Sequence, residues 1–113
     1  MKAARLYVAQ RLTAALMAPL VIGHLAVMFY ATSNGLSAAD ILGRTSGSVG
    51  WALFYGVFAV AVAVHAAIGL RAISIEWAGA SEQAADGLML ISGSVLALLG
   101  LRAVAAVVFP GAL

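Results

Sequence analysis

Two histidines lie inside long uncharged stretches of this sequence, where an ionisable side chain is expensive and usually marks function. His24 follows Gly23 in the first stretch, and His65 precedes Ala66 and, four residues on, Gly69 in the second. Neutral imidazole can ligate iron through one ring nitrogen, and haem held between two histidines is a common electron carrier. The alternative is a histidine that hydrogen-bonds a carbonyl of a neighbouring helix, and close helix packing explains the small neighbours equally well. The pattern therefore indicates haem ligation or helix packing.

The stretches around these histidines are long enough to cross a membrane. Of 113 residues, 65% are hydrophobic and 9% charged, with a mean hydropathy of +1.10, whereas a soluble domain carries about 25% charged residues. No charge occurs in residues 12–32, 45–70 and 87–101, and residues 103–113 stay apolar after Arg102. A helix of about 20 apolar residues spans a bilayer core. We predict one all-α membrane domain over residues 1–113, with helices at about 8–32, 48–75 and 86–109.

The composition also excludes several classes of function. The chain has no cysteine, which excludes disulfides, iron–sulfur ligation and thiol catalysis. Its six basic residues are dispersed along the sequence, so they do not indicate nucleic-acid binding. The spans hold no carboxylate and no filter-like ring, which argues against a proton-coupled exporter and against a channel.

The connections between the predicted helices are polar and rich in glycine and serine. Residues 33–35 (SNG) end the first helix with turn chemistry, and Ser37 and Asp40 have the spacing of a capping box, so we expect a short interfacial turn over residues 37–42. Residues 43–50 read as a Gly- and Ser-rich loop. Trp51, Phe54 and Tyr55 are typical of an interfacial aromatic belt.

Basic residues predict the orientation of the chain in the membrane. On the side of the N-terminus and the second connection lie Lys2, Arg5, Arg11 and Arg71; the other side has Arg44, together with Arg102 if that side chain snorkels outward. This bias predicts a cytoplasmic N-terminus. The first apolar run exceeds a typical signal-peptide core, so we expect it to be a retained span.

The two histidines are expected at different depths. His24 lies ~20 Å along its helix from Arg11, whereas His65 lies only ~9 Å from Arg71 on the returning helix. If both arginines mark the same interface, the two histidines do not share one iron. The chain has no third histidine, so each would need a ligand from a second subunit.

Three motifs in this order resemble a known family. The stretch from His65 to Arg71 (HAAIGLR), followed by Glu76, is similar to the pattern His-x-x-x-Gly-x-Arg-His with an acid eleven residues after the first histidine. Residues 10–13 (QRLT) resemble His-Arg-x-Ser/Thr-Gly, and residues 20–27 (LVIGHLAV) resemble a first helix whose histidine ligates haem. Together they resemble the cytochrome b membrane-anchor subunits of succinate dehydrogenase and fumarate reductase, over about residues 5–76.

The resemblance implies a C-type small anchor subunit, whose three spans form half of a heterodimeric bundle around one or two b haems. Its implied iron ligands are His65 and His24. The residues implied to contact haem propionates are Arg11, Arg71 and Arg102, although Arg102 also reads as a snorkelling residue. The implied quinone contacts are Arg11, Thr13, Gln10 and Tyr7.

Three positions depart from the family pattern. Ala72 replaces the histidine after Arg71, and Gln10 replaces the histidine before Arg11. Tyr7 occupies the place of a serine that helps to bind quinone. Quinone binding therefore follows less directly from the resemblance than haem ligation by His65 does.

The resemblance further implies a non-catalytic subunit of respiratory complex II, an enzyme of the tricarboxylic acid cycle. Its partners would be a second small membrane anchor, an iron–sulfur subunit and a flavoprotein subunit. Electrons would pass between the iron–sulfur subunit and ubiquinone or menaquinone in a bacterial plasma membrane, with the mitochondrial inner membrane as the alternative. Competing readings are a haem-free helical scaffold of a respiratory or transport complex, and a small transporter subunit.

Overall fold

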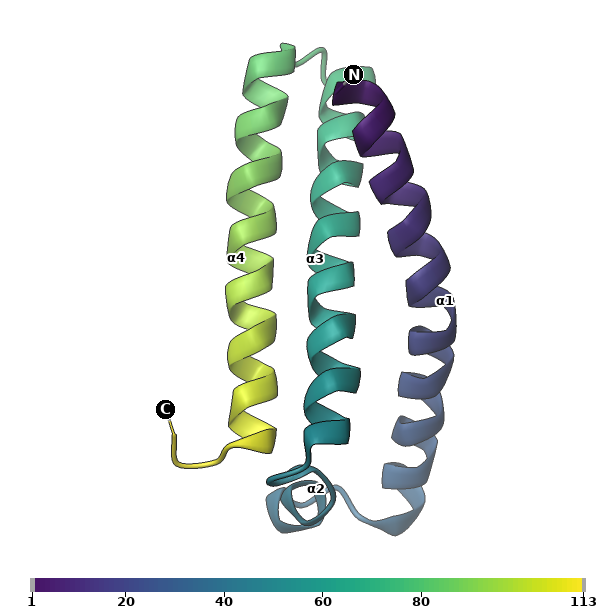
Figure 1. Cartoon of the computed structure of the whole chain (residues 1–113), viewed down its shortest axis with the longest axis vertical. Coiled ribbons are helices and arrows are strands. Elements are labelled where there is room, and N and C mark those ends of the chain that lie inside the picture. The colour runs from purple at the N-terminus through teal and green to yellow at the C-terminus, as the bar shows by residue number, and fades with distance from the viewer. Residues whose placement is uncertain (1, 113) are drawn as a thin grey trace.

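The computed structural model describes residues 2–112, and these residues form three long helices and one short helix (Figure 1). In chain order they are α1 (Lys2–Asn34), α2 (Ala38–Thr45), α3 (Val49–Glu76) and α4 (Glu82–Val108). The long helices α1, α3 and α4 are each long and apolar enough to cross a membrane. The prediction of an all-α chain with three spans is therefore confirmed.

Two of the long helices begin earlier than the apolar pattern predicted. Helix α1 starts at Lys2 instead of about residue 8, because the preceding Lys, Ala and Arg residues have high helix propensity although they are not all apolar. Helix α4 starts at Glu82 instead of about residue 86. Ser81 caps it by accepting a hydrogen bond from the backbone N–H of Ala84, and Glu82 complements the helix dipole.

The short helix α2 confirms the predicted capping box and extends beyond it. The Ser37 hydroxyl accepts from the backbone N–H of Asp40, and the Asp40 carboxylate accepts from the backbone N–H of Ser37. The helix continues to Thr45, so Gly43 is helical and not part of a loop as expected. The capped first turn and a buried last residue stabilise this extra turn.

Helix α3 lies between α1 and α4 (Figure 1). It packs closely on α4 because glycines of α4 face alanines of α3. A Cβ atom on Gly93 would lie 3.1 Å from that of Ala67, and one on Gly100 would lie 3.0 Å from that of Ala59. This small-residue seam allows near contact of the two backbones, as is common between membrane helices.

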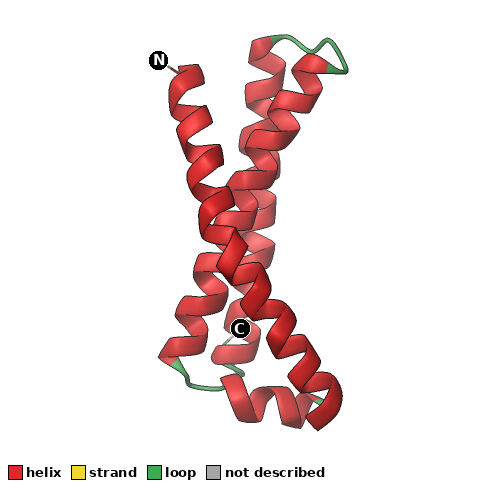
Figure 2. Ribbon diagram, turned by 90° about the vertical axis from the view of Figure 1, so that its right-hand side faces the viewer, coloured by secondary structure: helices red, strands yellow, loops and turns green. Residues whose placement is uncertain are grey.

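Helix α1 crosses the α3–α4 pair obliquely (Figure 2). It is bowed, and Pro19 inside it removes one backbone hydrogen bond, which accounts for such a bend. Most large apolar side chains of the bundle are exposed. Lipid or partner subunits must therefore cover them. The α1–α3 interface holds both histidines, so the fold positions them between the same two helices.

Candidate functional site

His65 meets Thr13 across the α1–α3 interface. The Nδ1 atom of His65 lies 3.1 Å from the Oγ1 atom of Thr13. The same Oγ1 atom lies 2.8 Å from the carbonyl oxygen of Ala9 and 3.0 Å from that of Gln10. A hydroxyl has one proton to donate, and threonine in a helix commonly donates it to a carbonyl three or four residues back. The hydroxyl oxygen is then free to accept a hydrogen bond from Nδ1 of His65.

The role of Thr13 in this contact decides which ring nitrogen of His65 carries the lone pair. With the proton on Nδ1, the lone pair is on Nε2. Within residues 2–112, Nε2 forms no hydrogen bond, and it is not among the polar atoms that are both enclosed and unpaired. A metal-ligating histidine usually donates its other ring N–H to a neighbouring acceptor. His65 can adopt this arrangement with Thr13 as the acceptor.

One helical turn toward the N-terminal end of the bundle, Gln10 lies over Gly69. The Nε2 atom of Gln10 is 3.6 Å from the place where a Cβ atom on residue 69 would lie. The Oε1 atom of Gln10 is buried and accepts no hydrogen bond. Gly69 thus leaves room for the amide, and the amide leaves one buried acceptor unfilled about one helical turn from the level of His65.

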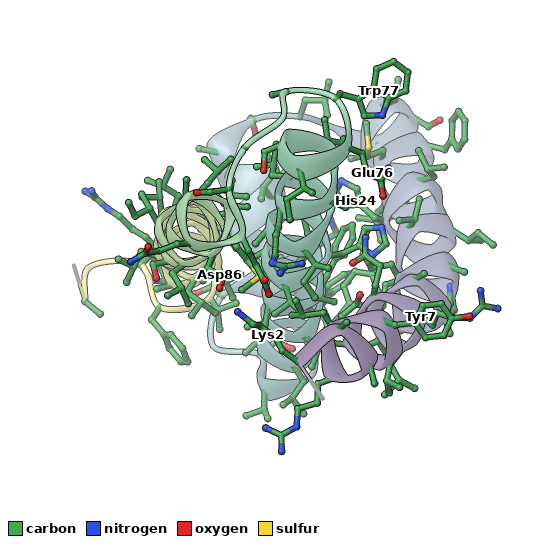
Figure 3. All side chains as sticks on the ribbon, turned by 90° about the horizontal axis from the view of Figure 1, so that it is seen from above. Lys2, Tyr7, His24, Glu76, Trp77 and Asp86 are labelled. Atoms are coloured by element: carbon green, nitrogen blue, oxygen red, sulfur yellow. The ribbon has the colours of Figure 1, made fainter. Side chains whose placement is uncertain are left out.

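His24 has a different environment between the same two helices. Its ring centroid lies 5.4 Å from that of Phe58 and 6.1 Å from that of Tyr55, with an edge-on geometry to the tyrosine. Figure 3 shows the imidazole between α1 and the central helix. Its Nδ1 atom is buried without a partner. Tyr55, expected in an interfacial belt, packs against this histidine.

The contacts of the two histidines separate them in depth. On α3, His24 meets Phe58, which lies seven residues before His65 and therefore ~10 Å away along the helix axis. On α1, eleven residues or ~16 Å separate Thr13 from His24. The two imidazoles thus occupy different levels of the bundle, as the sequence predicted.

A charge cluster joins three helices at the N-terminal end of the bundle. The Nε atom of Arg71 donates to Asp86 at 2.7 Å, and its Nη2 atom lies 3.3 Å from Glu82. Lys2 pairs with the same two carboxylates, and Figure 3 shows it beside Asp86. The Arg71 side chain is only 15% exposed. Arg71, expected to contact a propionate, therefore has carboxylate partners in its own chain. The acids that follow Arg71 in the sequence were the available signal for this pairing.

Arg11 lies on another face of α1. Its Cζ atom is 5.7 Å from the ring centroid of Tyr7, which is 63% exposed. Among residues 2–112 no carboxylate pairs with Arg11. Figure 3 shows Tyr7 pointing away from the bundle. The four predicted quinone contacts are therefore split: Gln10 and Thr13 face α3, whereas Arg11 and Tyr7 face outward.

Arg102 lies on the exposed surface of α4. With Leu98, Leu101 and Ala105 it lines a shallow hollow that neither histidine touches. Its outward position fits the expectation of a snorkelling residue. The structure does not bring Arg102 together with the other predicted site residues.

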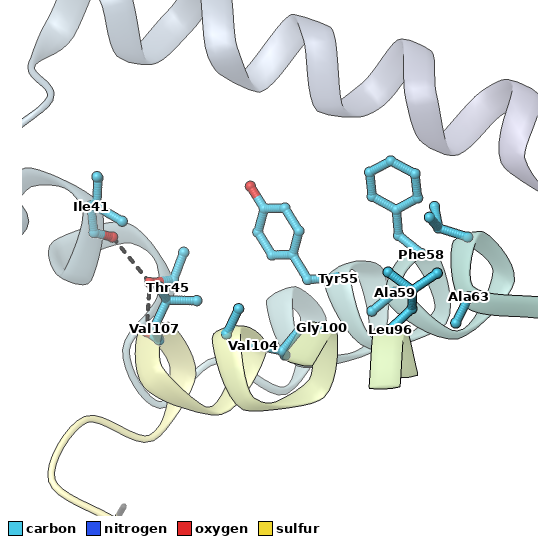
Figure 4. Close-up of a pocket in the computed structure, with 12 residues that line it drawn as sticks. Ile41, Thr45, Tyr55, Phe58, Ala59, Ala63, Leu96, Gly100, Val104 and Val107 are labelled. Carbon is cyan, nitrogen blue, oxygen red and sulfur yellow. Dashed lines mark hydrogen bonds between the residues drawn. The ribbon is translucent and has the colours of Figure 1, made fainter. Parts of the chain in front are cut away.

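An apolar groove of about 480 Å³ lies between α2, α3 and α4. Figure 4 shows Tyr55 and Phe58 beside it, and Thr45 at one end, where the Thr45 hydroxyl contacts the carbonyl oxygens of Val107 and Ile41. Neither histidine lines this groove. Nor do residues 2–112 contain a cluster of three His, Cys, Asp or Glu side chains that would hold a metal ion by itself. The described residues thus offer a single imidazole at each of the two levels of the α1–α3 interface, so a second iron ligand would have to come from elsewhere.

The sequence matches a protein-family model over most of its length. A family model described as succinate dehydrogenase/fumarate reductase transmembrane subunit matches residues 2–109. No curated protein and no solved structure gives a significant match to the sequence.

Proposed function

The chain belongs to the succinate dehydrogenase/fumarate reductase transmembrane subunit family, and we propose that it ligates a b haem through His65 in the membrane anchor of such a complex. Family membership makes it a multi-pass membrane-anchor subunit, with the other subunits of the complex as partners. The haem ligand, its neighbours and the type of anchor subunit are our proposal. The signature that begins at His65 supports the C-type assignment.

The contact between His65 and Thr13 carries the proposal. It gives the Nδ1 proton an acceptor and leaves Nε2 with a lone pair, which is the form of imidazole that ligates iron. The ring is half-buried between α1 and α3, so it is both held and reachable. Haem bound there would supply a one-electron carrier in a dry medium. A partner subunit would provide the second axial ligand, because His24 lies at another level.

We propose one haem on this chain in preference to two. The Nδ1 atom of His24 is enclosed and has no acceptor. That nitrogen lacks a partner whether it carries a proton or a lone pair, so no contact among the described residues fixes the tautomer that leaves Nε2 unprotonated. His65 has such a contact in Thr13. Packing against Phe58 and Tyr55 is the role that these contacts support.

Arg11 is our candidate for the anionic groups of a cofactor. Its guanidinium lacks a carboxylate partner among the described residues, whereas Arg71 is already paired with Asp86. A free guanidinium can form two charge-assisted hydrogen bonds to a propionate or one to a quinone oxygen. We assign Arg71 to joining α3 with α4. Gln10 is a candidate for a different group, a donor such as a quinol hydroxyl, because its buried Oε1 is an acceptor without a donor.

We further propose that the N-terminal end of the bundle faces the iron–sulfur and flavoprotein subunits at the cytoplasmic surface of a bacterial plasma membrane. Three of the basic residues near this end, Lys2, Arg5 and Arg11, precede the apolar core of α1. His65 lies closer to this end than His24 does. Electron transfer with quinone would therefore take place near His65.

The test is haem stoichiometry in the purified complex, measured for wild type, His65→Ala and His24→Ala. We expect His65→Ala to lose the haem and His24→Ala to keep it. Equal haem in wild type and His65→Ala would overturn the ligand assignment. A wild-type complex without haem would favour the haem-free scaffold, and loss in both variants would restore the two-haem reading.

A further inference from the structure

Thr13 contacts the proposed ligand directly, and its hydroxyl can act there as donor or as acceptor. In the donor arrangement, the hydroxyl proton would go to Nδ1 of His65, and the ring proton would lie on Nε2. In the acceptor arrangement, the hydroxyl proton goes to a carbonyl of its own helix, and Nδ1 keeps the ring proton. Only the second arrangement leaves Nε2 free to bind a metal.

The distances favour the acceptor arrangement. The Oγ1 atom of Thr13 is 2.8 Å from the carbonyl oxygen of Ala9, 3.0 Å from that of Gln10 and 3.1 Å from Nδ1 of His65. Two carbonyl oxygens, which are acceptors only, thus compete for one hydroxyl proton. The imidazole can serve as the donor that the remaining lone pair of Oγ1 needs. A β-branched side chain in a helix has few rotamers, so this position of Oγ1 is well defined.

We propose that Thr13 is the positioning residue of His65: its hydroxyl oxygen accepts the Nδ1–H hydrogen bond, holds the ring orientation and keeps Nε2 unprotonated. This inference rests on the proposed function, in which Nε2 ligates the haem iron. It removes Thr13 from the quinone contacts expected from the family motif. Thr13 acts through His65 and touches no cofactor.

Such a neutral acceptor should influence the bound haem measurably. A hydrogen bond from Nδ1–H makes imidazole a stronger donor to iron, which stabilises the ferric state. Loss of the acceptor should therefore raise the midpoint potential of the haem. It should also release haem faster, by about tenfold or more, because loss of a residue that supports a metal ligand typically weakens metal binding by this factor.

The experiment compares Thr13→Val, Thr13→Ala and Thr13→Ser with wild type in the purified complex. Valine keeps the shape of threonine without the hydroxyl, and serine keeps the hydroxyl. Redox titration of the haem band and the rate of haem transfer to excess apomyoglobin are measured. We expect a higher potential and faster release for valine and alanine, and near wild-type values for serine.

Thr32→Val provides the matched control. Thr32 also lies in α1, and its hydroxyl donates to the carbonyl oxygen of Met28, four residues back, at 2.8 Å. Within the described part of the chain it forms no hydrogen bond with a histidine. It should leave both measurements unchanged. An equal shift in Thr32→Val would overturn the proposal, because the effect would then follow from loss of any back-bonded hydroxyl in α1.

The failure of this inference can be told apart from the failure of the proposed function. If His65→Ala loses haem but Thr13→Val matches wild type in potential and release, Thr13 does not position the ligand, and His65 remains the ligand. If His65→Ala keeps its haem, the proposed ligand is wrong and the role of Thr13 falls with it. A Thr13→Val complex that does not assemble leaves Thr13→Ala and Thr13→Ser to decide by the same two measurements.

Discussion

His65 and His24 lie between the same two helices, and the difference between them lies in what their Nδ1 atoms contact. Nδ1 of His65 has a threonine hydroxyl at 3.1 Å. Nδ1 of His24 is enclosed by aromatic neighbours and has no partner. Hydrogen bonding therefore prepares one imidazole for a metal, whereas packing holds the other.

This difference teaches that the type and depth of a residue in a span are not enough to identify a ligand. Both histidines are half-buried, and both follow or precede small residues. What distinguishes them as candidate ligands is the neighbour across the interface. A hydroxyl supplies an acceptor for Nδ1–H, while the faces and edges of Phe58 and Tyr55 do not.

The largest expected effect is chemical rescue at His65 alone. His65→Gly should abolish haem binding, and imidazole added during assembly should restore it by filling the space with a free ligand. His24→Gly should keep its haem with or without imidazole. Haem content of the purified complex is measured in all four conditions. Rescue at position 24 would remove the distinction between the two histidines.

The next effect tests how Gly69 supports the His65 level. A Cβ atom at position 69 would lie 3.6 Å from Nε2 of Gln10, which is an ordinary van der Waals distance. Gly69→Ala should therefore be tolerated. Gly69→Leu should push α1 away and separate Thr13 from His65, at an overpacking cost of about 1–3 kcal/mol. We expect Gly69→Leu to release haem faster than wild type in the apomyoglobin assay.

Gly56→Leu is the control for this substitution. Gly56 also lies in α3, but nothing is within 4 Å of a Cβ atom placed there. It should retain haem as wild type does. If both leucine variants release haem equally fast, the effect comes from loss of a helical glycine and not from the spacing of α1 and α3.

Much of the fold could be predicted from the sequence because the membrane simplifies the problem. Charge-free runs placed three spans, and the capping box at Ser37 placed the first turn of the short helix α2 but not its continuation to Thr45. The starts of α1 and α4 were missed, since helices extend past the apolar core wherever caps and helix-forming residues allow. Apolar runs indicate the hydrocarbon boundary, not the helix ends.

The candidate site was only partly predictable. Residue types and spacing identified His65 and Thr13 separately, but not that they meet. That contact depends on the rotation and crossing of α1 against α3, which no local pattern contains. The same reason applies to Arg71: its sequence position suggested a cofactor contact, and the turn between α3 and α4 brings Asp86 to it, a contact that no local pattern contains.

A smaller effect distinguishes Arg71 from Arg11, which both lie toward the N-terminal end of the bundle. Asp86→Ala leaves the mostly buried Arg71 with only the exposed Glu82, which should lower the thermal midpoint of the complex. Arg71→Gln should likewise lower the thermal midpoint while the haem spectrum stays as in wild type. Thermal unfolding followed by circular dichroism gives the first quantity, and redox difference spectra give the second.

Arg11→Gln should show the opposite pattern to Arg71→Gln, with an effect on cofactor binding and not on stability. Arg11 has no carboxylate partner among the described residues, so its loss should leave the thermal midpoint near wild type. It should instead weaken haem or quinone binding. If Arg71→Gln disturbs the haem spectrum more than Arg11→Gln does, our assignment of the two arginines is reversed.

The smallest effect is expected at α2, far from the His65 level. Hydrogen bonds from the Ser37 hydroxyl and backbone N–H lower the pKa of Asp40 below its ordinary value of 3.8. A carboxyl whose pKa is lowered by folding stabilises the fold above that ordinary value, and the contribution is lost as the pH falls through the lower pKa. Asp40→Asn should remove this acid dependence in thermal unfolding monitored between neutral and acidic pH.

Asp40→Asn should leave the haem potential unchanged, because the interactions of both histidines are with residues of α1 and α3. A shift of the potential in Asp40→Asn would mean that the α2 end influences the haem, and the contrast between the two histidine levels would then fail.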